Sequence, residues 1–418
     1  MPLEIVLPEE QTLIKAARLY DGAAEHCDAH CYVTLSGDSI TDMGASADLG
    51  TSAAEQFDQV IELNDEVTLM PGLINMHTHL TFSTLPSVYD DALQDSDTTK
   101  TIRMIEALRA ATDCGITTVR DCGTWPHLIL PTKDAVESGL LPGPRIVASG
   151  AITTTGGHCY FCATEADNED EVRKAVRSHV KSGVDFIKLF ATGGNTTPGS
   201  NALIAQYTEA EMCAASDEAR KAGRRTASHA HALEGVRTSI AARVTTIEHC
   251  SFQMPDGFGW DDEMVSEIID AGIYVCPTVF RGIAKFEGDP SYTFSERERM
   301  ILGRRRERFA LTERLADRGV MLVSGNDCGV THSMMSDYPI DLVETAEKCH
   351  ISARDVVRSA TSVAADALGR PELGRIKADA AADLLVVEGD PLADIHAVTR
   401  PRTVIGRGRV LRQHSLQH

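Results

Sequence analysis

The middle of the chain alternates between two patterns of hydrophobic and polar positions. Short apolar runs bounded by Gly or Pro are typical of strands that are buried on both faces. Between most of them lie longer segments whose apolar residues recur every three or four positions and which often end at a Gly, as amphipathic helices do. Eight strands are therefore expected at residues 72–79, 115–122, 144–150, 184–191, 225–230, 244–250, 272–278 and 320–327.

This alternation predicts the fold class. Eight strands, with helix-like stretches such as 99–115 and 168–183 between them, indicate an α/β protein with a parallel (β/α)8 barrel of the TIM type. A doubly wound open sheet is the competing architecture. No G-x-G-x-x-G sequence opens a helix early in the chain, which disfavours that alternative.

The two ends of the chain have a different pattern. Both read as short strands and turns, so we expect them to pair into a small β-sandwich-like domain built from both termini. The expected boundaries are residues 1–70 for the N-terminal part of this β domain, 71–378 for the barrel and 379–418 for the C-terminal part of the β domain.

Composition and charge narrow the classes of partner. Of the 418 residues 43% are hydrophobic, enough for a large core, and 61 Asp and Glu against 40 Lys and Arg give a formal net charge of −21. Such a surface repels phosphate backbones, so no nucleic-acid partner is expected. No apolar run approaches the ~20 residues needed to span a membrane, and the N-terminus lacks the features of a secretory signal.

The cysteines bear on the cellular compartment. Eleven are present, an odd number, and they are scattered along the chain. This pattern favours reduced thiols, several of them buried as small hydrophobic residues, and a cytoplasmic location.

Candidate chemistry begins with the sequence PGLINMHTHL at residues 71–80. His77 and His79 stand one residue apart at the end of an apolar run. Because side chains alternate along a strand, both imidazoles point to the same side and could bind one metal ion. For this motif alone, an ordinary pair of core or surface histidines is the alternative.

Potential metal ligands recur at the ends of other expected strands. Active sites of parallel barrels lie at the carboxyl ends of the strands. Five of the eight expected strands carry such a residue, and coincidence is a weak explanation for all five together. Beside the two histidines of the first strand, these residues are Lys188, His229, His249 and Asp327.

Lys188 stands inside the fourth expected strand, with Phe186 and Phe190 on the same face. An ammonium group is costly to desolvate there, and burial favours a neutral amine. Asp185 should face outward and is not expected to pair with it. One interpretation is that the amine captures carbon dioxide as a carbamate, which offers two oxygens to two metals. A Schiff-base lysine is the other, but it leaves the histidines and the aspartate unexplained.

These motifs resemble a known family. The sequences PGLINMHTHL, VDFIKLFATGG, SHAH, TIEHC and SGNDCG, in this order, are similar to the amidohydrolase superfamily of metal-dependent hydrolases. The resemblance is greatest to its prolidase-like branch, related to imidazolonepropionase-type enzymes, with dipeptidase- and ochratoxinase-like hydrolases among its members. It covers nearly the whole chain, because ADLLVVEGDPLADI also resembles the returning β segment of the superfamily.

The resemblance implies a binuclear centre with two divalent metal ions. Zinc is the expected metal because imidazole and carboxylate ligands suit it. The first-strand histidines and the aspartate would hold the more buried ion, two later histidines would hold the second, and the N6-carboxylated lysine would bridge both. The implied metal ligands are His77, His79, Lys188, His229, His249 and Asp327.

The resemblance also implies a reaction. A metal-bridging hydroxide would cleave a C–N bond, amide or peptide, in a small substrate such as a dipeptide or an N-acyl amino acid. Asp327 would carry the proton to the leaving nitrogen. His158, after the third strand, and His231, two residues beyond His229, would contact the substrate carbonyl or carboxylate. A homo-oligomer, an octamer in this branch, is expected by the same resemblance.

Three alternatives stay open from the sequence. One is hydrolysis of an amide, carbamate or urea xenobiotic or a mycotoxin, as in ochratoxinase-like enzymes. Another is a mononuclear deaminase or cyclic amidase of the same superfamily. Such deaminases place a Glu close after the fifth-strand histidine, where this chain has Ala232 and only later Glu234. The last is a non-catalytic scaffold, which the six filled ligand positions disfavour.

Substrate choice depends on segments without a readable motif. These are the expected loops at residues 81–98, 193–207 and 280–298. The last of them could form a lid that offers Arg281 and Lys285 to a substrate carboxylate.

Overall fold

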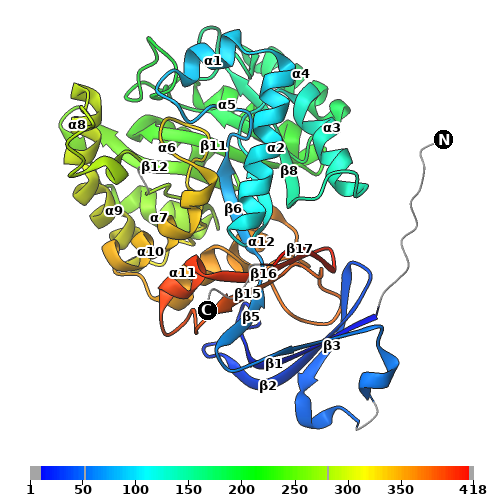
Figure 1. Ribbon diagram of the computed structural model, residues 1–418. Coiled ribbons are helices and arrows are strands. Elements are labelled where there is room, and N and C mark those ends of the chain that lie inside the picture. Colours follow the sequence, from blue (N-terminus) through cyan, green and yellow to red (C-terminus); the bar gives the residue numbers. More distant parts are fainter. Residues whose placement is uncertain (1–10, 51–52, 280–281, 414–418) are drawn as a thin grey trace.

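The protein has a mixed α/β fold, and the computed structural model in Figure 1 describes residues 11–50, 53–279 and 282–413. Helices surround a curled sheet, and a second sheet lies to one side of it (Figure 1). Among the described residues, no helix is both long and apolar enough to cross a membrane.

The curled sheet contains the strands expected in the middle of the chain. Its order is β13-β12-β11-β10-β8-β7-β6, with β14 paired to β12 and β9 to β8. Neighbouring long strands run parallel. The strands are β6 (Leu73–Thr78), β7 (Ile116–Asp121), β8 (Arg145–Thr153), β9 (Thr164–Glu165), β10 (Phe186–Phe190), β11 (Arg225–Ala232), β12 (Thr246–Met254), β13 (Gly257–Phe258) and β14 (Tyr274–Cys276). All of the expected strands except the last are confirmed.

Helices fill the intervals between these strands. The ends of α4 follow from its sequence, because the Asn168 side chain accepts the N–H of Glu171 and Gly183 closes the helix at φ 95°. The helices are α1 (Val88–Gln94), α2 (Asp97–Asp113), α3 (Pro126–Glu137), α4 (Glu169–Ser182), α5 (Glu209–Lys221), α6 (Leu233–Ala241), α7 (Asp262–Asp270), α8 (Glu296–Gly303), α9 (Arg305–Asp317), α10 (Tyr338–Lys348), α11 (Ala353–Ser359) and α12 (Ser362–Leu368). The helices expected at 99–115 and 168–183 are thus confirmed as α2 and α4.

The eighth expected strand, residues 320–327, is an extended segment without a regular ladder. It still links the two ends of the curled sheet, because a bridge joins it to β14 and Met76 N–H of β6 donates to Ser324 O at 2.9 Å. The C-terminal end of α11 competes for its backbone, since Ser324 N–H donates to Ser359 O at 3.0 Å. The expected barrel is therefore a curled parallel sheet whose ends meet through one irregular segment.

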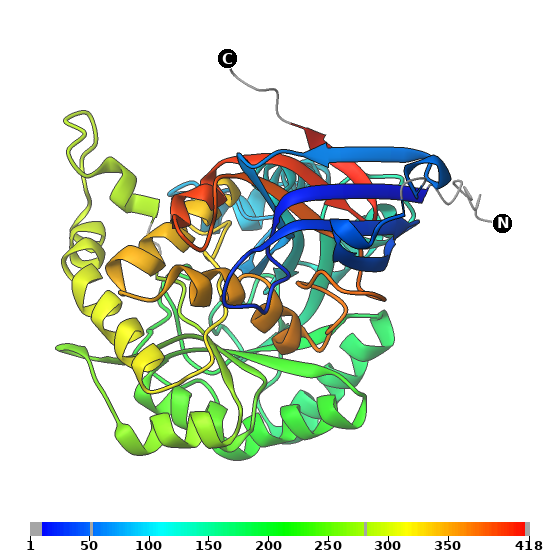
Figure 2. The same cartoon turned by 90° about the horizontal axis from the view of Figure 1, so that it is seen from below.

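Strands from both ends of the chain form the second sheet. Its order is β17-β16-β15-β5-β1-β2-β3, with β4 paired to β1. Figure 2 shows the blue N-terminal and red C-terminal strands side by side, where β5 and β15 pair antiparallel. The strands are β1 (Gln11–Leu19), β2 (Asp28–Ser36), β3 (Ser39–Ala45), β4 (Gln59–Leu63), β5 (Val67–Pro71), β15 (Leu384–Glu388), β16 (Pro401–Gly406) and β17 (Arg409–Gln413). The pairing of the termini is confirmed for this sheet, whereas a separate sandwich-like domain stays a prediction.

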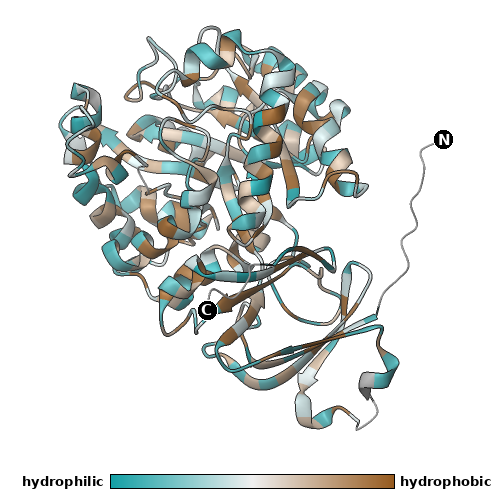
Figure 3. Ribbon diagram, in the orientation of Figure 1, coloured by the Kyte–Doolittle hydropathy of each residue, from teal (hydrophilic) through white to brown (hydrophobic). Residues whose placement is uncertain are grey.

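Strand β15 packs on both of its faces. Leu384 and Val386 belong to the core of the second sheet, whereas Leu385 and Val387 belong to the core shared with α2 and β7. Gly115, at φ 85°, allows the turn after α2 to approach, because a Cβ there would lie 2.9 Å from Leu385. Hydrophobic residues are visible along these C-terminal strands in Figure 3.

Candidate metal centre

A first group of candidate ligands lies where β6 ends. His77, His79 and Asp327 place one ligand atom each within 4.8 Å of one another. Asp327 Oδ1 lies 3.3 Å from His77 Nε2 and 3.4 Å from His79 Nε2. Burial and the charge of Lys188 lower the pKa of His77 to about 4. His77 is therefore a neutral imidazole near pH 7, the form that coordinates metals.

A second group lies at the ends of β11 and β12. His229, His231 and His249 also place ligand atoms within 4.8 Å of one another. His249 Nε2 lies 3.0 Å from His229 Nδ1, and Thr278 Oγ1 lies 2.7 Å from His249 Nδ1. Burial and the neighbouring histidines lower the pKa of both His229 and His249 well below the usual value.

The two groups adjoin. The ring centroids of His77 and His249 are 5.1 Å apart. His231, which the sequence assigned to the substrate, stacks on His249 at 4.4 Å and lies within ligand distance in the second group. Its role as a substrate contact stays a prediction.

Lys188, in the middle of β10, is 0% exposed. Its Nζ atom has no hydrogen-bond partner among the described residues. Its positive charge contributes to the lowered pKa of His77 and of His249, which places it beside both ligand groups. Asp185 instead accepts from Lys133 Nζ at 2.6 Å, so it faces outward as expected. No carboxylate lies at hydrogen-bond distance from this buried Nζ among the described residues, and an anionic adduct with two metals would give it polar contacts.

His158, on the loop after β8, lies beside the second group. It is buried, its ring centroid is 4.7 Å from that of His229, and its Nδ1 has no hydrogen-bond partner among the described residues. Gly194 makes room for this ring, because a Cβ there would lie 2.3 Å from His158 Nε2. The structure thus brings every predicted site residue to one end of the curled sheet, although their roles remain predictions.

The backbone is unusual at two of these positions. His249 has φ 68° and Asp327 has φ 55°, both in the left-handed region. Such conformations are costly for residues other than glycine and cluster at functional sites. At His249 the left-handed backbone also breaks the alternation of the strand. As a result, both Glu248 and His249 face the interior, where Glu248 contacts His77 and His249 stacks on His231.

Glu248 and Arg120 are residues that the sequence interpretation missed. Glu248 Oε2 accepts from His77 Nδ1 at 2.8 Å, and Oε1 accepts from Arg120 Nη2 at 2.6 Å. Burial alone would raise the pKa of Glu248, but Arg120 and the hydrogen bond of His77 lower it below its usual range. The available signal was a charged residue within each of two strands, TTVRDC and TTIEHC, that should be buried on both faces.

Five aromatic side chains follow β6, β7 and β8. They are partly exposed except Phe82, and Phe161 contacts the other four at ring-centroid distances of 5.6 to 6.2 Å. We call them the aromatic wall: Phe82, Tyr89, Trp125, Tyr160 and Phe161. Phe82 also stacks on the His79 ring at 4.8 Å. The wall therefore extends from the first ligand group towards solvent.

The cysteines and the two basic residues of the expected lid were also considered in the sequence. All eleven cysteines are free thiols, and Cys159 and Cys162 form a C-x-x-C pair beside His158, which the interpretation of the cysteines as scattered wrongly overlooked. Lys285 donates to Asp337 Oδ2 at 2.7 Å, so its charge is already paired within the protein. Arg281 lies outside the described residues.

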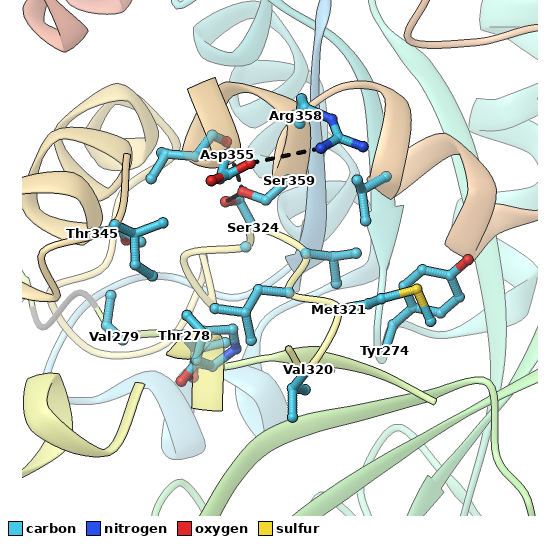
Figure 4. A pocket seen from close by; sticks show the side chains of 18 of the residues that line it. Tyr274, Thr278, Val279, Val320, Met321, Ser324, Thr345, Asp355, Arg358 and Ser359 are labelled. Carbon is cyan, nitrogen blue, oxygen red and sulfur yellow. Dashed lines mark hydrogen bonds and ion pairs between the residues drawn. The ribbon is translucent and has the colours of Figure 1, made fainter. Parts of the chain in front are cut away.

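A cavity of about 470 Å³ lies between β14, the irregular segment and helices α9 to α12. Figure 4 shows its lining, which includes Tyr274, Met321 and Arg358. None of the candidate ligands lines it. Two of its lining residues contact candidate ligands: the Thr278 hydroxyl contacts His249, and Gly325 lies against His77.

Comparisons with known proteins agree on one family. A model of the amidohydrolase family matches residues 68–411. Ochratoxinase from Aspergillus niger is 24% identical over 96% of this chain and 87% of its own length. Its crystal structure superposes with a TM-score of 0.83 at 21% identity over 97% of this chain and 96% of that chain, a likeness of fold alone.

Two solved structures are more similar in sequence. A Xaa-Pro dipeptidase with methionine bound in its active site has a TM-score of 0.84 and 27% identity, over 97% of this chain and 100% of that chain. A prolidase in complex with N-methylphosphonate-L-proline has a TM-score of 0.83 and 27% identity, with the same coverage.

Proposed function

The chain belongs to the amidohydrolase family, and on that premise we propose that it is a metal-dependent hydrolase of a C–N bond in a small substrate. The bond would be the amide or peptide bond of a dipeptide or an N-acyl amino acid. One observation carries the proposal: two groups of buried histidines meet beside a fully buried lysine whose Nζ has no hydrogen-bond partner among the described residues. The dipeptidase and prolidase likenesses support the bond type.

The residues fit a pair of divalent ions. His77, His79 and Asp327 would hold one ion, and His229 with His249 would hold the other. Lys188, carboxylated by carbon dioxide at Nζ, would bridge them as an anion. When bound, the ions would supply an activated water and polarise the scissile carbonyl. Zinc suits these ligands best.

The side chains of the chain itself would then orient the substrate and move protons. Asp327 is 15% exposed, more than either histidine it contacts, so it can reach both a water and the leaving nitrogen. It would take a proton from the attacking water and deliver it to that nitrogen. His158 and His231 would hold the carbonyl or carboxylate of the substrate, since both rings flank His229.

The aromatic wall favours a substrate with an aromatic group. Ligand sites are lined mainly by apolar and aromatic side chains, and this wall begins directly at His79. An N-acyl aromatic amino acid or an amide-linked aromatic xenobiotic, as the ochratoxinase likeness suggests, is therefore the second candidate.

The experiment combines metal analysis with a substrate panel. Zinc-loaded protein is expected to hold two equivalents per chain and to release free amine from dipeptides or N-acyl amino acids. One equivalent with ammonia release would favour a deaminase, and no bound metal would favour a scaffold.

Asp327→Asn adds a matched test of the mechanism. It should lower turnover by about 10²–10⁴-fold while the protein stays folded. The control variant is Asp337→Asn, ten residues further along the chain. It breaks the ion pair between Asp337 and Lys285 and should keep most activity. Undiminished turnover of Asp327→Asn would disprove the proton transfer.

A further inference from the structure

We infer that Glu248, held by Arg120, is a positioning residue that fixes the ring of His77 for metal binding. The inference rests on the proposed metal centre and concerns a residue that is not itself among its ligands. Glu248 lies in β12 and reaches across the interior of the curled sheet to His77 in β6.

Every polar contact of Glu248 is made within the interior. The side chain is 0% exposed. Oε2 accepts from His77 Nδ1 at 2.8 Å, while Oε1 accepts from Arg120 Nη2 at 2.6 Å and from Thr246 Oγ1 at 2.5 Å. Both carboxylate oxygens are thus hydrogen-bonded. The three partners lie in three strands: His77 in β6, Arg120 in β7 and Thr246 in β12.

Arg120 is equally engaged. Its Nε donates to Met76 O at 2.6 Å, and its Nη1 donates to Thr246 Oγ1 at 2.9 Å. A buried ion pair contributes little net stability compared with apolar residues of similar size, because both charges lose their hydration. Stabilisation of the fold is therefore a weak explanation for the Glu248–Arg120 pair. Its contact with His77 points instead to a role in positioning that histidine.

The hydrogen bond selects one tautomer of His77. An ionised carboxylate can only accept, so the proton of His77 must be on Nδ1. Nε2 then carries the lone pair, and this atom faces Asp327 Oδ1 at 3.3 Å in the first ligand group. Partners of this kind orient a ligating histidine and raise its basicity. Arg120 in turn holds the carboxylate in place.

The left-handed backbone at His249 makes this arrangement possible. A regular strand would send Glu248 and His249 to opposite faces, but φ 68° at His249 brings both inward. One strand therefore supplies a candidate ligand to the second group and the support for a ligand of the first. Loss of Glu248 should weaken metal binding at the first group before the second.

The test compares Glu248→Gln with a matched control. Gln keeps the shape but removes the charge that fixes the His77 tautomer. Asp383→Asn removes the buried carboxylate from another ion pair, that with the partly exposed Arg145 at 2.6 Å, which touches no candidate ligand. Zinc is extracted from each loaded protein by a competing chromophoric chelator, and unfolding by heat is recorded in parallel.

Glu248→Gln is expected to weaken zinc binding at one of two sites by about 10–100-fold. Asp383→Asn should lose thermal stability but keep both zinc affinities within a few-fold. Equal zinc affinity in Glu248→Gln and wild type would overturn the inference, as would an equal loss in both variants. A wild-type protein that binds no zinc would instead refute the proposed function, and this inference with it.

A second variant covers a failure of Glu248→Gln to fold. Glu248→Asp keeps a negative charge beside Arg120 but is one methylene too short to keep the contact with His77. We expect it to fold and to show the same selective loss of zinc. Unchanged zinc affinity in this variant would equally overturn the inference.

Discussion

Lys188 is a buried lysine with unusual surroundings. Its position between two phenylalanines on a buried strand predicted a neutral amine without an acidic partner on that strand, and the structure leaves its Nζ without a hydrogen-bond partner among the described residues. Its neighbours are imidazoles rather than carboxylates, apart from the two acids that contact His77. Chemistry at the amine, rather than an ion pair, therefore explains it best.

Lys188→Ala should remove the bridge between the two ions. We expect metal content to fall below two equivalents and hydrolysis to fall at least about 100-fold, with partial rescue by short carboxylic acids that fill the space. Metal analysis and amine release measure both effects. Lys133→Ala, which breaks the pairs with Asp185 and Glu137 and touches no candidate ligand, is the matched control. Full metal content and activity of Lys188→Ala would exclude a carbamate bridge.

Also at the residue scale, the inward orientation of Glu248 could not be predicted from the sequence. The strand-end residues followed from period-two alternation and from the position of barrel active sites. Two consecutive inward side chains require a left-handed residue at His249, and nothing in TIEHC signals that backbone. The role of Arg120 could not be predicted either, because it depends on which strands face each other across the interior.

At the scale of elements, the loop after β10 packs against the loop after β8. Gly194 lies so close to His158 that Gly194→Ala must displace the ring. We expect this variant to keep its metal but to raise KM or lower kcat by about tenfold, since a shift of even 1 Å in a positioning group is costly. Steady-state kinetics measure this. Gly303→Ala, at a position with nothing within 4 Å, is the control.

The loops that carry the aromatic wall make a separate prediction about substrate. The chain has two tryptophans, so Trp260→Phe leaves Trp125 as the only reporter in the wall. The double variant Trp260→Phe, Asp327→Asn turns over slowly enough for binding to be measured. It should bind N-acetylphenylalanine at least about tenfold more tightly than N-acetylalanine, and binding should quench the fluorescence of Trp125. Phe161→Leu should reduce this difference. Equal affinities for the two ligands would argue against the wall as a substrate surface.

The presence and order of strands and helices were the most predictable part of the fold. Gly and Pro at the ends of apolar runs marked nearly every strand, and the Asn168 cap and Gly183 marked α4. The segment at 320–327 was the exception. Its Ser324 N–H bonds to Ser359 O at the end of α11, which is a tertiary contact that local pattern does not contain.

At the scale of the whole molecule, His77, His229 and His249 predict how stability depends on pH. His79, which despite burial has its pKa raised by Asp327, acts in the opposite sense. His77 has its pKa lowered to about 4, and those of His229 and His249 also lie well below 6.5. Below pH 6.5 the unfolded chain therefore binds protons that the folded protein does not. Since stability rises with pH wherever the unfolded state binds more protons, the metal-free protein should lose stability as pH falls from about 6.5 towards 4.

The expected slope is up to about 1.4 kcal/mol per pH unit for each of these histidines. Urea unfolding of metal-free protein between pH 7 and 4 measures it. His77→Gln should flatten the profile relative to wild type. A profile that is flat in the wild type would mean that these rings already carry protons in the folded state.

The homo-oligomer expected from the resemblance to the family stays a prediction.

The antiparallel contact of β5 with β15 also has a consequence for biosynthesis. Residue 71 leaves the ribosome 313 residues before its partner at position 384 does. At about 5–20 residues per second, that edge stays unpaired for roughly 15–60 s. During this interval the nascent chain needs protection from aggregation, and slowing translation in that window should lower the yield of folded protein.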